Sequence, residues 1–152
     1  MQTNRIKIKP QLRSYNIDVD VYDRVIHLYI GRNIKEAKCG AEEEFKDLNI
    51  HEDEVHGMVA CVFTVENKQG HRGHIMLIGM DEFLDPEEND IDLLSVCAHE
   101  SLHLSWRILD AVGIDINVHN HEAQAYLLEH LFKNCKEAIK HYIKTYKLKI
   151  TL

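Results

Sequence analysis

Two histidines and a glutamate in one short stretch form a pattern that could hold and use a metal ion. His99-Glu100-Ser101-Leu102-His103 reads H-E-x-x-H, and residues four apart in a helix lie on the same face, one turn apart. Both imidazoles could therefore bind one zinc ion. Glu100 would stand beside the metal as a general base that takes a proton from a zinc-activated water. The pattern predicts hydrolytic chemistry, which needs three protein ligands and one open position on the zinc.

The third zinc ligand must come from farther along the chain. The longer motif H-E-x-x-H-x-x-G-x-x-H would need Gly and His at the positions of Trp106 and Leu109, which excludes it. Glu122, at the start of the next predicted helix, could complete a His, His, Glu ligand set. Tyr126 lies one turn later on the same face and is either a packed aromatic or a catalytic oxyanion donor. Three other side chains stay open as alternatives to Glu122: Asp115, His119 and His121.

Residues 99–132 resemble the active-site core of a minimal gluzincin, a metallopeptidase-like protein of the phage and prophage type. The shared features are H-E-x-x-H, a Leu-Asp-x-x-Gly-Ile segment at 109–114 and an Asn-x-Glu-x-x-Ala-Tyr-Leu segment at 120–127. The resemblance covers about residues 56–132, and a more distant one is to cytoplasmic metallopeptidases that cleave phage-type repressors. It implies a zincin-like fold with Zn2+ as cofactor and Glu100 as general base. The zinc ligands that it implies are His99, His103 and Glu122.

The H-E-x-x-H motif and the family resemblance together predict a zinc-dependent metallopeptidase that hydrolyses peptide bonds in a peptide or protein substrate. Two alternatives stay open. One is a zinc-binding, non-proteolytic phage or host interaction protein on a zincin scaffold. The other is a structural domain without metal, in which His99 and His103 pack or face solvent. The second alternative has weight because a short motif can arise by chance in a chain with eleven histidines among 152 residues.

The surrounding pattern predicts one α+β domain over residues 1–152, with strands first and two long helices after them. Strands are expected at 4–9, 17–30, 56–66, 71–80 and 146–152, and helices at 34–47, 86–112 and 120–145. Asp85-Pro86-Glu87-Glu88 has the pattern of a capping box that would begin the H-E-x-x-H helix, and Gly113 would end it. We expect a mixed or antiparallel sheet to cover this helix. A strand of the 56–80 hairpin would border the cleft and hold an extended peptide.

The composition and charge of the chain indicate which partners and which cellular location to expect. The formal net charge is −7, with basic residues gathered near both ends and acidic residues in the middle. This balance favours a cleft that attracts cations and basic peptides, and it argues against a nucleic-acid partner. Because the sequence has no long apolar run and no secretory signal, we expect a cytoplasmic protein with no membrane partner. The four cysteines form no C-x-x-C pair and are expected to be reduced and mostly buried. The oligomeric state stays open.

Two further predictions concern side chains outside the motif. Asp110 either orients a ligand imidazole or forms a surface salt bridge with Arg107. The histidines around the predicted hairpin are expected on the surface or at the rim of a pocket. They are His51, His56, His71 and His74.

Overall fold

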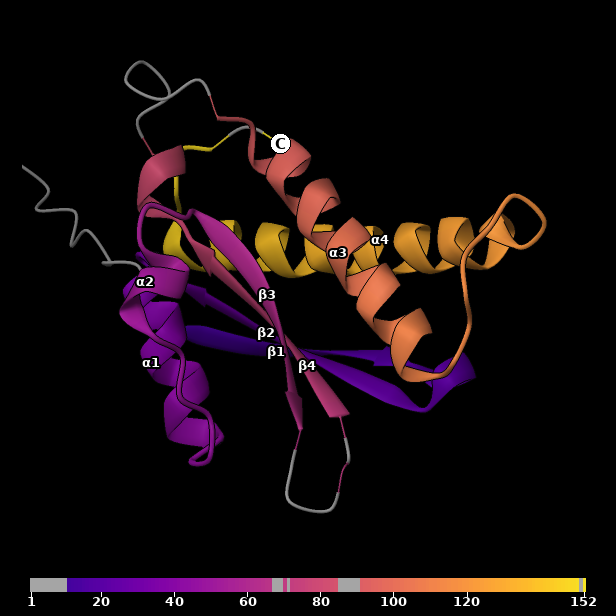
Figure 1. The fold of residues 1–152 in the computed structure, drawn as a ribbon. Helices are drawn as coiled ribbons and strands as arrows, with labels where there is room; N and C mark the ends of the chain where they lie inside the picture. Colours follow the sequence, from indigo (N-terminus) through magenta and orange to yellow (C-terminus); the bar gives the residue numbers. More distant parts are fainter. Residues whose placement is uncertain (1–10, 67–69, 71, 85–90, 151) are drawn as a thin grey trace, which may run out of the picture.

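A computed structural model describes residues 11–66, 70, 72–84, 91–150 and 152 of the chain. Within these residues, four strands form a sheet in the order β1-β2-β4-β3 (Figure 1). They are β1 (Arg13–Val19), β2 (Arg24–Gly31), β3 (Ala60–Glu66) and β4 (Arg72–Gly79). β2 and β4 are parallel, whereas β1 with β2 and β3 with β4 are antiparallel. The sheet is therefore mixed, and β1 and β3 are its edges in the described part of the chain.

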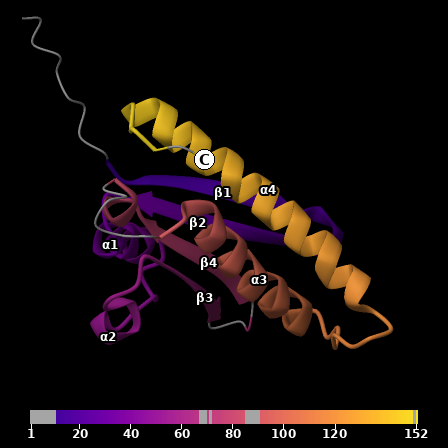
Figure 2. The same cartoon turned by 90° about the horizontal axis from the view of Figure 1, so that it is seen from above.

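Helices cover both faces of the sheet because apolar side chains alternate along its strands. The helices of the described residues are α1 (Ile34–Glu44), α2 (Glu52–Val55), α3 (Leu93–Ala111) and α4 (His121–Tyr146). Leu28 and Met76 point to one face and belong to the core beneath α3 and α4. Tyr29 and Leu77 point to the opposite face and pack with α1. α3 lies over β3 and β4 and α4 over β1 and β2, so α3 and α4 run side by side (Figure 2). The α+β class predicted from the sequence is confirmed.

The helix that carries H-E-x-x-H is shorter than predicted. α3 begins at Leu93 because the Asp92 side chain accepts a hydrogen bond of 2.7 Å from the backbone N–H of Ser95. Residues 91 and 92 are not helical, so the predicted continuous helix from residue 86 is wrong, and the capping pattern at 85–88 lies outside the described residues. The predicted end is confirmed. Gly113 has a φ of 75°, and the N–H of Ile114 returns to the carbonyl of Leu109 at 2.8 Å.

Residues 17–30 do not form the single extended segment that was predicted. A 3₁₀ turn at Asp20–Tyr22 interrupts them, and Asp23, with a φ of 49°, directs the chain back into β2. β1 and β2 therefore pair as a hairpin, with Val19 opposite Arg24. Apolar β-branched residues continue on both sides of the turn, and for this reason the sequence pattern does not reveal it.

The predictions for the two ends of the chain have different outcomes in the structure. The predicted strand at 4–9 lies outside the described residues, and residues 148–150 form no strand, so the predicted C-terminal strand is wrong there. α4 ends because Lys147 adopts a left-handed conformation with a φ of 52°. α2 was not predicted. The helices expected at 34–47 and 120–145 and the antiparallel pair of β3 and β4 are confirmed.

The cysteines agree with the prediction of reduced, mostly buried thiols. All four are free, and Cys61, Cys97 and Cys135 are buried, whereas Cys39 is exposed. In the described ranges, no helix has both the length and the apolar character needed to cross a membrane.

Candidate functional site

His99 and His103 face each other across one turn of α3. Their Nε2 atoms are 3.0 Å apart, and their rings meet edge to face with centroids separated by 4.6 Å. Two nitrogens that bind one zinc ion at about 2.0–2.1 Å in tetrahedral geometry are roughly 3.3 Å apart. The two rings therefore need to separate by only a few tenths of an ångström to share an ion. The i, i+4 spacing brings the imidazoles together as predicted.

Glu100 is buried beside this pair, with 8% of its surface exposed. Burial raises the pKa of its carboxyl above the ordinary value, and the positive charges of His103, His99 and Arg107 act in the opposite direction. Burial, and after it the charge of Glu100, raises the pKa of the Cys61 thiol in β3 to about 12. The Glu100 carboxyl is therefore a buried acid directly next to His99 in α3. From there it can exchange a proton with a molecule held at the imidazoles.

β3 borders the candidate site and forms an edge of the sheet. α3 packs over β3, and Nη1 of Arg107 donates to Oγ1 of Thr64 at 3.4 Å. In the part of the chain that the structure describes, β3 pairs with β4 alone, so its outer side presents backbone N–H and C=O groups. An extended peptide can add to such an edge through main-chain hydrogen bonds. The predicted place of a hairpin strand beside the H-E-x-x-H helix is confirmed.

Glu122 does not lie with the histidine pair. α4 begins beyond the C-terminal end of α3 (Figure 1), and that end is roughly 12 Å along the helix axis from His103. The Glu122 side chain is 70% exposed, and its carboxylate lies 3.7 Å from Nδ1 of His121. Among the described residues, no three His, Cys, Asp or Glu side chains are gathered as a metal site. The structure thus brings together two of the three predicted ligands.

The alternative third ligands are not gathered with the pair either. Asp115, His119 and His121 are exposed, in or directly after the connection between α3 and α4. Hydrogen bonds between polar groups of the connection itself stabilise its conformation. The backbone N–H of Asn117 donates to Oδ1 of Asn120 at 2.8 Å, and Nδ2 of Asn120 donates to the carbonyl of Asp115.

Tyr126 occupies a different pocket from the H-E-x-x-H residues. It is 70% exposed and, with Leu127 and His130 of α4, lines a cavity of about 420 Å³ against the 3₁₀ turn at 20–22. The lining includes neither the histidine pair nor Glu100. The two side chains that were predicted to be catalytic, Glu100 and Tyr126, therefore do not line this pocket together.

Asp110 is paired differently from either prediction. Its Oδ2 atom lies 3.8 Å from Nη1 of Arg72 in β4. Within the described residues it contacts neither Arg107 nor a ligand imidazole. Asp110 therefore belongs to a charged group at the C-terminal end of α3 and not to the histidine pair.

His74 is buried, although the sequence predicted a surface or pocket-rim position. It has no exposed surface, and its Nδ1 atom lies 3.3 Å from Oγ1 of Thr64. The signal that could have found it is the alternation along β4, which places His74 on the same face as Met76. His51 and His56 are exposed as predicted, and residue 71 lies outside the described residues.

Comparisons with family models, with curated proteins and with solved structures found no match to this chain. Any function must therefore be proposed from the arrangement of α3 and β3 and from the sequence motif.

Proposed function

We propose that this protein is a zinc-dependent metallopeptidase with a zincin-like fold. The observation that carries the proposal is the arrangement on α3. The Nε2 atoms of His99 and His103 are 3.0 Å apart, the Glu100 carboxyl is buried next to them, and the edge strand β3 runs alongside. Glutamate is rarely buried without a partner or a task. A buried carboxyl one residue after the first of two converging imidazoles matches the needs of metal-assisted hydrolysis.

Each side chain of the motif has a distinct role in this proposal. His99 and His103 hold the zinc ion, and Glu122 is the proposed third ligand. When bound, zinc polarises a carbonyl group and lowers the pKa of water. Glu100 accepts a proton from the attacking water and passes it to the leaving amine, which breaks the peptide bond. β3 holds the substrate as an extended strand and so positions the carbonyl for attack.

The third ligand requires a movement. The Glu122 side chain lies beside His121 and is 70% exposed, whereas Ala123 in the same turn packs against the core. The first turn of α4 must approach the histidine pair for Glu122 to bind the same ion. Zinc binding and the position of this turn are therefore coupled in the proposal.

The proposal is tested by the hydrolysis rate of the Glu100→Gln variant loaded with zinc. Glutamine keeps the shape of the side chain but cannot accept the proton, so we expect unchanged zinc content. Cleavage of a mixed peptide library is expected to fall by at least about a hundredfold. Glu129→Gln changes an exposed carboxyl on α4 and is the matched control, which keeps full activity. Cleavage by the Glu100→Gln variant at the wild-type rate would refute the role of Glu100.

The zinc content of protein purified without an affinity tag separates the remaining possibilities. The proposal predicts one equivalent of zinc, lost in a His99→Ala, His103→Ala double variant. It also predicts at least about tenfold weaker zinc binding in Glu122→Ala and no change in Glu129→Ala. One equivalent of zinc with no cleavage of any peptide would favour the non-proteolytic phage or host interaction protein. Protein that binds no zinc would favour the domain without metal.

A further inference from the structure

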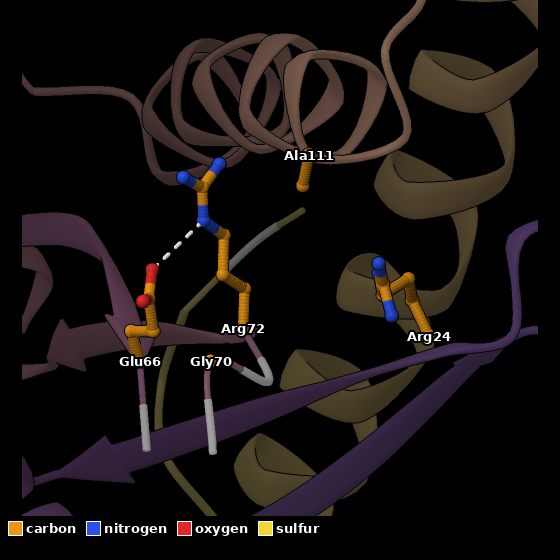
Figure 3. Close-up of a pocket in the computed structure, with 5 residues that line it drawn as sticks. All are labelled: Arg24, Glu66, Gly70, Arg72 and Ala111. Atoms are coloured by element: carbon orange, nitrogen blue, oxygen red, sulfur yellow. Dashed lines mark hydrogen bonds and ion pairs between the residues drawn. The ribbon is translucent and has the colours of Figure 1, made fainter. Parts of the chain in front are cut away.

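A pocket opens on the α3 side of the sheet, at the C-terminal end of that helix (Figure 3). It has a volume of about 380 Å³ and is lined by Arg24, Glu66, Gly70, Arg72 and Ala111. Arg24 is the first residue of β2 and Arg72 the first residue of β4. Figure 3 shows these two arginines on different sides of the pocket, with Ala111 of α3 at a third side. The pocket is therefore formed where two strands begin and α3 ends.

A third arginine lies close to the same place. Arg107 projects from α3 and donates to Thr64, which is paired in register with His74 of β4. The pKa of His74 falls to about 4, first because burial disfavours the charged ring and then because Arg24, Arg107 and Arg72 repel it. Arg24 and Arg72 line the pocket, and Arg107 reaches the strand pair beside it through Thr64. We call Arg24, Arg72 and Arg107 the basic cluster.

Two members of the basic cluster have no acidic partner among the described residues. Nε of Arg72 lies 3.1 Å from Glu66, and its Nη1 lies 3.8 Å from Asp110. Arg24 and Arg107 form no ion pair in the ranges that the structure describes, and the buried Nε of Arg24 has no hydrogen-bond acceptor there. The pocket therefore offers guanidinium donors to an anion, although the whole chain carries a formal charge of −7. The basic-peptide preference predicted from that charge does not extend to this end of the site.

The basic cluster is in line with the histidine pair. Arg107 follows His103 by four residues and therefore lies one turn farther along the same face of α3. The distance along the helix axis from the middle of the H-E-x-x-H turn to Arg107 is roughly 9 Å. An extended peptide covers that distance in about three residues at about 3.3 Å each. A peptide that runs along the edge of β3 past the imidazoles would bring a nearby residue to Arg107, the member of the cluster that contacts β3.

We propose that Arg107, together with the adjacent pocket lined by Arg24 and Arg72, binds a carboxylate of the peptide substrate, about three residues from the scissile bond. The carboxylate is an acidic side chain or the C-terminus of the substrate. Guanidinium groups suit this ligand because their planar N–H donors match the two oxygens of a carboxylate. The inference rests on the proposed function, since the metallopeptidase site defines where the peptide runs.

Peptide binding to the zinc-loaded Glu100→Gln variant tests the proposal without cleavage. The probes are fluorescein-labelled octapeptide libraries in which one position at a time is fixed as Asp, Asn, Glu or Gln, each made with a free C-terminal acid and with a C-terminal amide. We expect binding to be at least about tenfold tighter for one member of these pairs. Either Asp or Glu at one fixed position binds more tightly than Asn or Gln there, or the free C-terminal acid binds more tightly than the C-terminal amide. A position effect identifies a side chain, and an acid-to-amide effect identifies the chain end.

Arginine variants in the Glu100→Gln protein provide the control. Arg24→Gln and Arg107→Gln are each expected to abolish the acidic preference, and because Arg107 is exposed, its variant does not depend on the packing around Arg24. Arg32 follows the other end of β2, roughly 26 Å from Arg24 along the strand. The Arg32→Gln variant is therefore the control and is expected to keep the acidic preference. Equal binding of acidic and amide peptides, or a preference that survives in both cluster variants, would overturn the proposal.

Failure of the pocket proposal can be distinguished from failure of the proposed function. Wild-type protein that cleaves peptides without any acidic preference refutes the basic pocket and leaves the metallopeptidase proposal intact. An acidic preference in binding, without cleavage by the wild-type protein, supports the pocket and refutes peptide hydrolysis.

Discussion

Replacing His74 by asparagine is expected to make the folded protein less sensitive to acid. His74 has no exposed surface, and its pKa falls to about 4 from the ordinary 6.5 because of burial and the repulsion of three arginines. In the unfolded chain the ring returns to its ordinary pKa. Below pH 6.5 the unfolded chain therefore binds a proton that the folded protein does not bind, and the folded state loses stability.

The magnitude follows from the two pKa values. The loss begins near pH 6.5 and stops growing near pH 4, where the folded protein also binds the proton. The whole shift corresponds to about 3 kcal/mol, of which roughly 2 kcal/mol is lost between pH 7 and pH 5. The raised pKa of Glu100 acts in the opposite direction, since its burial makes the folded protein bind a proton more readily. Glu100 is present in both proteins, so its effect cancels when wild type and variant are compared.

Urea unfolding followed by circular dichroism at pH 8, 7, 6 and 5 measures this difference. Asparagine places a polar atom near the position of Nδ1 and keeps a partner for Thr64, but it does not titrate. We expect the free energies of unfolding of the two proteins to run parallel between pH 8 and 7. At pH 5 the wild-type value is expected to have fallen by roughly 2 kcal/mol more than that of His74→Asn. If both proteins showed the same pH dependence, burial and the basic cluster would not be the causes of a lowered His74 pKa.

Three further predictions concern the elements that hold the site. Leu104 of α3 is 1% exposed, so Leu104→Ala is expected to lower the free energy of unfolding by about 2–5 kcal/mol. A loss below about 1 kcal/mol would show that α3 is not anchored through this side chain. A Cβ atom at Gly79 would lie 2.4 Å from a backbone nitrogen of α1, whereas at Gly73 in the same strand the nearest atom is a valine methyl at 3.4 Å. We therefore expect Gly79→Ala to lower the melting temperature strongly and Gly73→Ala to leave it nearly unchanged, and equal effects would contradict this packing. Asn33 caps α1 by accepting a hydrogen bond of 2.9 Å, so Asn33→Ala is expected to cost about 1 kcal/mol in urea unfolding. The exposed Asn49 serves as the control, and an equal loss in Asn49→Ala would argue against the cap.

Elements with a local signal were predicted well from the sequence. The alternation along β3 and β4 and the 3.6-residue repeat of α4 require only near neighbours in the chain, and both elements are confirmed. The left-handed conformation of Gly113 was predicted because glycine is preferred after the last turn of a helix. The turn at Asp20–Tyr22 was missed because it carries no glycine or proline and lies between two apolar runs. The start of α3 is capped by Asp92, which lies outside the predicted capping pattern at 85–88.

The sequence by itself determined the histidine pair and its glutamate. Residues four apart on a helix must face each other, so the spacing of His99 and His103 was sufficient to predict their contact. Whether Glu122 joins them depends on where α4 begins relative to α3, and the lengths of two helices and their connection decide this together. The basic cluster depends on tertiary structure in the same way. Arg24, Arg72 and Arg107 are far apart in the chain. Arg24 and Arg72 line one pocket because a parallel pairing aligns the starts of β2 and β4, and Arg107 joins them because α3 packs over β3. Local spacing fixes chemistry within one helix, whereas packing of the sheet against that helix decides which distant charges surround it.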